Sequence, residues 1–103
     1  MAEIILYVDA NFGGLHTHLF GSTSDFTQIS IVGVGVLTGD LRIASWNDMV
    51  SSFVIVSGVW QFFRDINFQT PYGAGVQLGP GLYPWVEDVG IDNDSLSSIQ
   101  LVG

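Results

Sequence analysis

Several features that would point to a function are missing from this 103-residue chain. It has no cysteine, which excludes disulfide staples, thiolate catalysis and cysteine-ligated zinc. It has no apolar run of about 18 residues, the minimum for a membrane-spanning helix. Lys and Arg together number two against ten Asp and Glu, and the resulting net charge of −8 argues against nucleic acid or an anionic membrane as a partner.

Catalytic and targeting patterns are also missing. No serine lies in a G-x-S-x-G elbow and no nucleophile–base pair is visible, so we expect no enzymatic activity. The N-terminal residues Met1-Ala2-Glu3 lack a basic segment followed by a cleavable apolar stretch, so we expect no signal peptide. The compartment stays open, with an extracellular or cell-surface location favoured if the domain belongs to a larger secreted protein.

What the chain does have is short runs of β-branched and aromatic residues separated by turn residues. These runs predict strands, which we place at residues 4–8, 15–20, 28–37, 41–43, 53–56, 59–64, 76–78 and 99–102. The stretch 83–90 is the one helical candidate, with Pro84 near its start and Gly90 where a C-terminal cap belongs. The length and pattern predict a single all-β domain spanning residues 1–103.

One hexapeptide, N-D-x-x-S-S, occurs twice, at 47–52 and 93–98, each time just before an apolar run. Asn, Asp and Ser form tight turns with their own backbone, so a single copy is usually only a turn. Two copies gather carboxylate, hydroxyl and carbonyl oxygens, which are the ligands of Ca²⁺. The duplication therefore suggests calcium sites, although the EF-hand loop pattern is absent.

The rest of the chain repeats as well. Residues 63–68 match residues 7–12 as aromatic, two residues, one apolar residue and then Asn-Phe. This predicts two motifs, about 3–56 and 59–102, packed as an antiparallel β-sandwich of two Greek keys. The first motif carries extra residues within 29–43, either an added core hairpin or an apolar edge that pairs with another copy. We expect a monomer, with 29–43 as the alternative surface for self-association.

Several motifs together resemble the βγ-crystallin superfamily, most closely its microbial calcium-binding members. They are the aromatic-x₆-Gly spacing from Tyr7 to Gly14, the Asn-Phe-Gly-Gly within it, Ser57-Gly-Val-Trp60, and Leu78-Gly-Pro-Gly-Leu-Tyr83 ahead of the second hexapeptide. The resemblance covers nearly the whole chain. It implies a non-enzymatic pair of Greek key motifs with two crossed Ca²⁺ sites that stabilise the fold.

The resemblance also implies the ligands. The first ion would be held by the Met49 carbonyl, the Ser51 hydroxyl and the Asp94 carboxylate. The second would be held by the Ser95 carbonyl, the Ser97 hydroxyl and the Asp48 carboxylate. A further carbonyl for each would come from Val8 or Arg64, in an order left open. An extended backbone agrees with this set, because alternate residues point the same way and the second position points to the opposite side. Asn47 and Asn93 are then interpreted as turn residues.

The second motif departs from the pattern at Thr70, which stands where the spacing requires glycine. We expect Gly73 or Gly75 to take over the positive φ angle at that hairpin.

Two other groups of residues are candidate sites. His16 and His18 share one strand face, a spacing that can bind zinc, but no third ligand is evident and a solvated face is favoured. The alternative function is a carbohydrate- or surface-binding module with structural calcium, which an exposed row of Trp85, Tyr83 and Tyr72 would favour.

Overall fold

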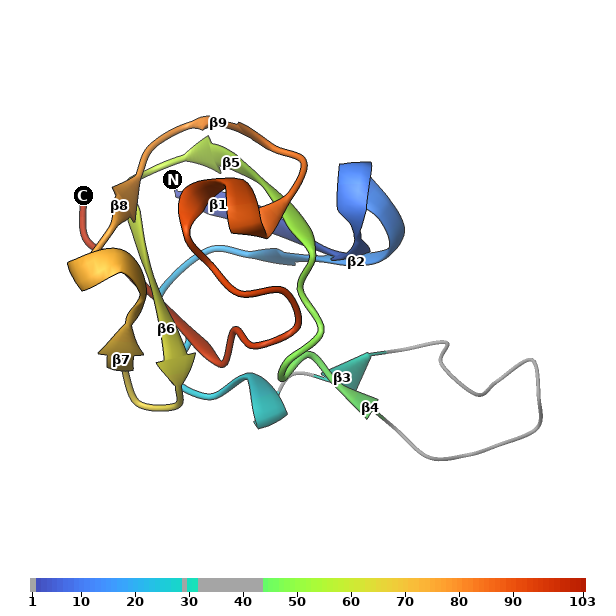
Figure 1. Cartoon of the computed structure of the whole chain (residues 1–103), viewed down its shortest axis with the longest axis horizontal. Helices are drawn as coiled ribbons and strands as arrows, with labels where there is room; N and C mark the ends of the chain where they lie inside the picture. Colours follow the sequence, from blue (N-terminus) through green and yellow to red (C-terminus); the bar gives the residue numbers. More distant parts are fainter. Residues whose placement is uncertain (1, 29, 32–43) are drawn as a thin grey trace.

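The computed structural model describes residues 2–28, 30–31 and 44–103 of the chain. Two four-stranded antiparallel sheets form most of the described chain (Figure 1). The first sheet has the order β2-β1-β5-β9, made of β2 (Gly13–Leu19), β1 (Glu3–Asp9), β5 (Ser52–Ser57) and β9 (Gly81–Tyr83). The second has β6 (Trp60–Asp65) paired with β10 (Ser98–Leu101), β7 (Gln69–Pro71) and β8 (Gln77–Leu78).

Short 3₁₀ turns connect the strands, and the described residues contain no α-helix. The turns are η1 (Ala10–Phe12), η2 (Phe26–Gln28), η3 (Tyr72–Ala74) and η4 (Val86–Val89). No helix in this part of the chain is long and apolar enough to cross a membrane. The prediction of an all-β fold with two antiparallel sheets is confirmed.

The core lies between the sheets because β1, β5 and β6 direct apolar side chains inward. Ile4 and Leu6 of β1 and Phe53 of β5 are fully buried, as are Trp60 and Phe62 of β6. The rings of Phe53 and Phe62 lie 4.9 Å apart between centroids and join one sheet to the other. Burying each such side chain contributes about 1.5–3 kcal/mol, so this layer dominates the stability of the fold.

The two halves exchange strands. β9 belongs to the second half of the sequence but pairs with β5 of the first, Val54 lying opposite Leu82. In return, Thr23 of the first half forms a bridge with Ile99 of β10. Each sheet is therefore completed by a segment from the other half, which is the Greek key arrangement that the repeat predicts.

The predicted helix at 83–90 is reduced to the single turn η4. Trp85 precedes its first residue with an extended backbone (φ −148°), and Gly90 ends it at φ 85°, the left-handed cap expected of a glycine. A segment this short leaves no room for a second turn before Ile91, which is buried in the core.

The predicted strands within 28–43 lie almost entirely outside the described residues. At their base, β3 (Ser30–Ile31) pairs antiparallel with β4 (Ala44–Ser45). The proposed pairing of 41–43, and the apolar edge at 29–43 apart from Ser30 and Ile31, lie outside the described residues.

The hairpin of the second motif differs from the prediction. Gly73 and Gly75 do have positive φ, but so does Thr70, at 59°. The Thr70 hydroxyl donates to Asp65 Oδ2 at 2.7 Å, a contact that holds a conformation strained for a β-branched residue. At the matching position of the first motif, a Cβ on Gly14 would lie 2.6 Å from Asp9 Oδ2. At this position, therefore, the first hairpin requires glycine and the second does not.

Candidate metal centre

The two hexapeptides form tight turns and not the extended strand starts that we predicted. Asp48 and Asp94 adopt left-handed backbone angles, with φ of 59° and 58°, and the strands begin only at Ser52 and Ser98. Aspartate tolerates this region because its short polar side chain can hydrogen-bond locally. Each aspartate side chain therefore points toward the other hexapeptide because its backbone is in a left-handed turn, and not because strand residues alternate in direction.

The turns are fastened to each other by reciprocal backbone hydrogen bonds. Asp48 N donates to Leu96 O at 3.1 Å, and Asp94 N donates to Val50 O at 3.4 Å. The positions are equivalent in the two copies, so an approximate two-fold axis relates the turns. The duplicated segments thus lie face to face.

Each turn is also attached to the first strand of its own half. Ser51 N donates to Tyr7 O and Ser97 N donates to Phe63 O, both at 3.0 Å. Val8 follows Tyr7 in the chain and Arg64 follows Phe63. Val8 therefore lies next to a residue bonded to the first hexapeptide, and Arg64 next to a residue bonded to the second.

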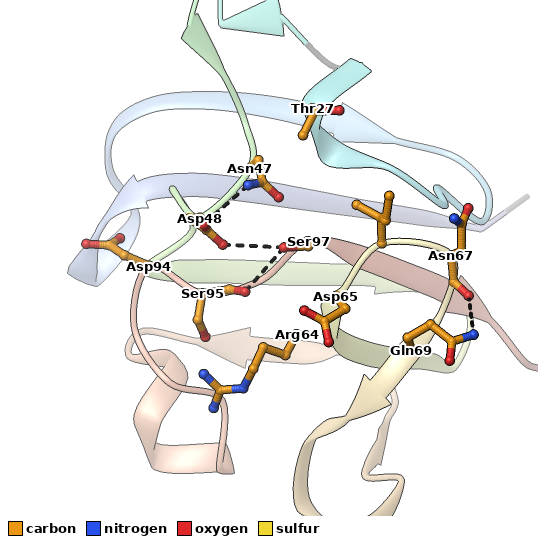
Figure 2. Close-up of a pocket in the computed structure, with 11 residues that line it drawn as sticks. Thr27, Asn47, Asp48, Arg64, Asp65, Asn67, Gln69, Asp94, Ser95 and Ser97 are labelled. Carbon is orange, nitrogen blue, oxygen red and sulfur yellow. Dashed lines mark hydrogen bonds between the residues drawn. The ribbon is translucent and has the colours of Figure 1, made fainter.

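Hydroxyl and carboxylate oxygens meet across the two turns. Ser51 Oγ lies 3.3 Å from Asp94 Oδ1, and Ser97 Oγ lies 3.3 Å from Asp48 Oδ1. Ser97 Oγ is also 3.5 Å from the Ser95 carbonyl oxygen, so three oxygens of the second set converge (Figure 2). Figure 2 shows Asp94 on the far side of the turn, away from this group. The two sets of oxygens are separate.

These spacings suit a hard cation. Two oxygens at right angles around Ca²⁺, each about 2.4 Å from the ion, are about 3.4 Å apart. The serines are almost buried, at 5% and 6% exposure, whereas both aspartates are exposed. Each of the two oxygen sets thus combines a buried serine hydroxyl with an exposed aspartate carboxylate.

The asparagine of each hexapeptide contacts the carboxylate of the aspartate that follows it. Asn47 Nδ2 lies 3.2 Å from Asp48 Oδ2, and Asn93 Nδ2 lies 3.3 Å from Asp94 Oδ2. In each case the bonded oxygen is the one that does not face the serine. Both asparagines thus act within the turn, as their interpretation from the sequence requires.

For Met49, Val8 and Arg64, the predicted ligands are backbone carbonyl oxygens. Met49 is half-buried and its amide donates to Trp46 O at 3.3 Å. No three His, Asp or Glu side chains gather into a metal-binding group anywhere in the described ranges. The predicted sites do not need one, because each takes a single carboxylate and completes its shell with hydroxyl, carbonyl and water oxygens.

Sequence reasoning missed the last serine of each hexapeptide. Ser52 Oγ donates to Asp9 O at 2.5 Å and accepts from Phe12 N at 3.0 Å. Ser98 Oγ likewise donates to Asp65 O at 2.6 Å and accepts from Phe68 N at 3.2 Å. Both serines are fully buried. Their place in a repeated hexapeptide was the available signal, but the hairpin residues that they bind are 30 or more residues away in sequence.

The surroundings of the second oxygen group differ from those of the first. A cleft of about 690 Å³ opens over it, lined by Asp48, Arg64, Asp65 and Ser97 among others. Arg64 forms an ion pair with Asp92, which raises the pKa of the guanidinium, and lies 5.4 Å from the centre of the Tyr72 ring. The positive charge of Arg64 at the cleft is therefore already paired with the carboxylate of Asp92.

Tyr72 supports this side from within the core. Its hydroxyl is 2.6 Å from Ser95 Oγ, which in turn donates to Asp92 O at 2.7 Å. Burial raises the pKa of Tyr72, while the bond to Ser95 acts in the opposite direction. Because Tyr72 is only 5% exposed, the exposed aromatic row with Trp85 and Tyr83 that would favour a carbohydrate-binding module does not form.

Fold and site together define a class: a β-sandwich of two Greek key motifs whose duplicated N-D-x-x-S-S turns meet at one end. Comparison with known proteins agrees. The sequence model of the Beta/Gamma crystallin family matches residues 3–102, so the chain belongs to the Beta/Gamma crystallin family. A beta/gamma-crystallin of Ciona intestinalis is 35% identical over 100 residues, which are 97% of this chain and 98% of the relative.

Solved structures give the same result. A betagamma-crystallin from an archaeon is 31% identical, with a TM-score of 0.72 and 98% of each chain covered. A transition-metal-ion-binding betagamma-crystallin from Methanosaeta thermophila is 33% identical, with a TM-score of 0.65, 96% of this chain covered and 99% of the other.

Proposed function

We propose that this crystallin domain is a non-enzymatic module that binds two Ca²⁺ ions between its motifs and is stabilised by them. The observation that carries the proposal is the reciprocal contact of Ser51 with Asp94 and of Ser97 with Asp48, at 3.3 Å in both cases. Each ion would thus have ligands from both halves of the chain. An unfolded chain could not hold them together, so binding would favour the folded state.

The contacts of Ser51 with Asp94, and of Ser97 with Asp48 and the Ser95 carbonyl, support the proposed ligand sets, and the resemblance to the family supplies the other carbonyls. One ion takes the Ser51 hydroxyl and Asp94 carboxylate, with the carbonyls of Met49 and Val8. The other takes the Ser97 hydroxyl and Asp48 carboxylate, with the carbonyls of Ser95 and Arg64. All of these donors are oxygens, which suits Ca²⁺ better than softer metals.

The expected stabilisation is large for a domain of this size. An ion present at a hundredfold excess over its Kd adds about 2.7 kcal/mol to the free energy of unfolding. The total for a small domain is only about 5–15 kcal/mol. Two ions would also change the net charge from −8 to −4 and relieve repulsion among the acidic side chains. Because the charge is negative, we propose neither nucleic acid nor an anionic membrane as a partner. We propose that the monomer binds the ions.

Calorimetry tests the proposal. Isothermal titration with CaCl₂ should give two ions per chain, and the thermal midpoint should rise with millimolar Ca²⁺. Mg²⁺ at the same concentration is the control, because Mg²⁺ demands a tighter octahedral shell and loses its water reluctantly. A thermal midpoint that is the same in Ca²⁺ and in chelator would reject the function.

A further inference from the structure

A group of nitrogen ligands lies away from the calcium turns, on the outer face of the first sheet. β2 is an edge strand, and His16 and His18 both project from its outer face, opposite Tyr7 and Ile5 of β1. Both imidazoles are exposed. Their ring centroids are 5.4 Å apart. This cluster has no part in the calcium proposal.

The separation of the two rings matches chelation of one metal. A transition metal lies about 2.0–2.1 Å from each imidazole nitrogen, so two imidazoles at a roughly tetrahedral angle have centroids about 5 Å apart. The rings are also held by their neighbours, since the His16 ring lies 5.6 Å from the Tyr7 ring and the His18 ring stacks on Phe20 at 6.5 Å. The separation of the two rings is therefore compatible with both binding one ion.

Glu3 supplies the feature that the sequence did not reveal. It lies on β1 with its Oε2 atom 2.6 Å from His18 Nδ1. A histidine that binds a metal almost always donates its other ring N–H to a carboxylate or carbonyl, which fixes the tautomer and the ring orientation. The contact makes Nδ1 the donor and leaves Nε2 of His18 as the nitrogen that can bind a metal.

We propose that His16 and His18 form a two-nitrogen chelate for a divalent transition metal, oriented by Glu3 and completed by water. Imidazole ligands select Cu²⁺, Ni²⁺ and Zn²⁺ over Ca²⁺ and Mg²⁺. Glu3 is a positioning residue here, because its carboxylate faces His18 and not the ion. The site needs no third protein ligand, in keeping with the absence of a three-residue group among the described residues.

Nickel is the probe of choice, and the calcium-loaded protein is the sample, so that the oxygen sites are filled beforehand. Titration with NiSO₄ should give one Ni²⁺ per chain. His16→Gln and His18→Gln should each weaken binding at least about tenfold and the double variant should abolish it, because a single imidazole cannot chelate. Glu3→Gln should weaken binding about 10–100-fold while keeping the stoichiometry, as loss of an outer partner does.

Two controls separate this site from the rest of the molecule. Thr17→Ser alters the residue between the histidines, whose side chain lies on the other face of β2, and should leave nickel affinity unchanged. Asp48→Asn should lose the stabilisation from one of the two Ca²⁺ ions and retain nickel binding. Nickel bound equally by the double histidine variant would overturn the proposed site, and an unchanged affinity in Glu3→Gln would overturn the role of Glu3. Neither result would bear on calcium.

Discussion

The crossed arrangement predicts which pairs of substitutions damage the same ion. Ser51 and Asp94 come from different halves of the chain but face each other at 3.3 Å. If they share one ion, Ser51→Ala and Asp94→Asn should each remove that ion, and the double variant should lose no more calcium-dependent stability than either single variant. Ser51→Ala combined with Ser97→Ala should remove both ions.

The magnitudes follow from the linkage of binding to folding. Losing one ion at a hundredfold excess over Kd should lower the free energy of unfolding by about 2.7 kcal/mol. For a chain of this length, each kcal/mol corresponds to about 4–8 °C, so the thermal midpoint should fall by roughly 10–20 °C. In chelator, Ser51→Ala loses only a long hydroxyl–carboxylate contact and should differ from the parent by less than about 1.5 kcal/mol.

Scanning calorimetry at fixed calcium and in EDTA measures both quantities, and agreement of the calorimetric and van't Hoff enthalpies verifies two-state unfolding. Ser97→Ala with Asp48→Asn gives the mirror-image cycle across the two-fold axis. Additive losses in the Ser51–Asp94 pair, with each substitution removing a separate ion, would refute the crossed sites. The calcium function itself would survive that result.

Three further predictions concern the hairpins and the core. Ser52→Ala and Ser98→Ala should each cost about 1–3 kcal/mol in urea unfolding, with or without calcium, because each removes a buried hydroxyl that pairs a hairpin N–H and C=O; an effect seen only with calcium would contradict this. Thr70→Gly should be more stable than Thr70→Val by about 1 kcal/mol, because glycine removes the positive-φ strain while valine keeps it and loses the bond to the carboxylate; equal stabilities would show that the strain is absent. Burial raises the pKa of Tyr72 above its unfolded value, so its contribution is present below about pH 10 and is lost as the pH rises through the folded pKa. Tyr72→Phe should therefore flatten the alkaline decline of the free energy of unfolding, measured between about pH 9 and 11.5, and an unchanged slope would argue against burial of the hydroxyl.

The elements that were predictable from sequence are those with a local pattern. Runs of β-branched and aromatic residues at 4–8 and 59–64 located β1 and β6, and the duplicated hexapeptide located the turns that meet at one end. The pairing of Ser51 with Asp94 was available only through resemblance to a family, because nothing local says that residues 43 positions apart in sequence face each other.

The errors have a common physical origin. Asp48 and Asp94 precede apolar runs, which suggested an extended backbone, but reciprocal hydrogen bonds to Leu96 and Val50 hold them in left-handed turns. Gly73 or Gly75 was expected to carry the positive φ in place of Thr70, yet the hydroxyl contact with Asp65 holds Thr70 itself at positive φ. In each case a partner outside the local window overrides the local preference.

The neighbourhood of the histidines is a further case. Strand alternation correctly placed His16 and His18 on one face of β2. The role of Glu3 depends on how β1 is aligned with β2, because a shift of one residue would turn its side chain to the opposite face. That alignment is a property of the folded sheet and not of any short stretch of sequence.

The exchange of β9 and the Thr23 segment has a consequence for fragments of the chain. If the polypeptide were cleaved at Gly58, neither piece could make a finished sheet, since each would lack an outer segment that the other supplies and would expose unpaired backbone there. We expect such pieces to recombine when mixed, and either piece alone to associate with itself. By the same logic, an ancestor of half this length would have had to function as a pair of identical chains.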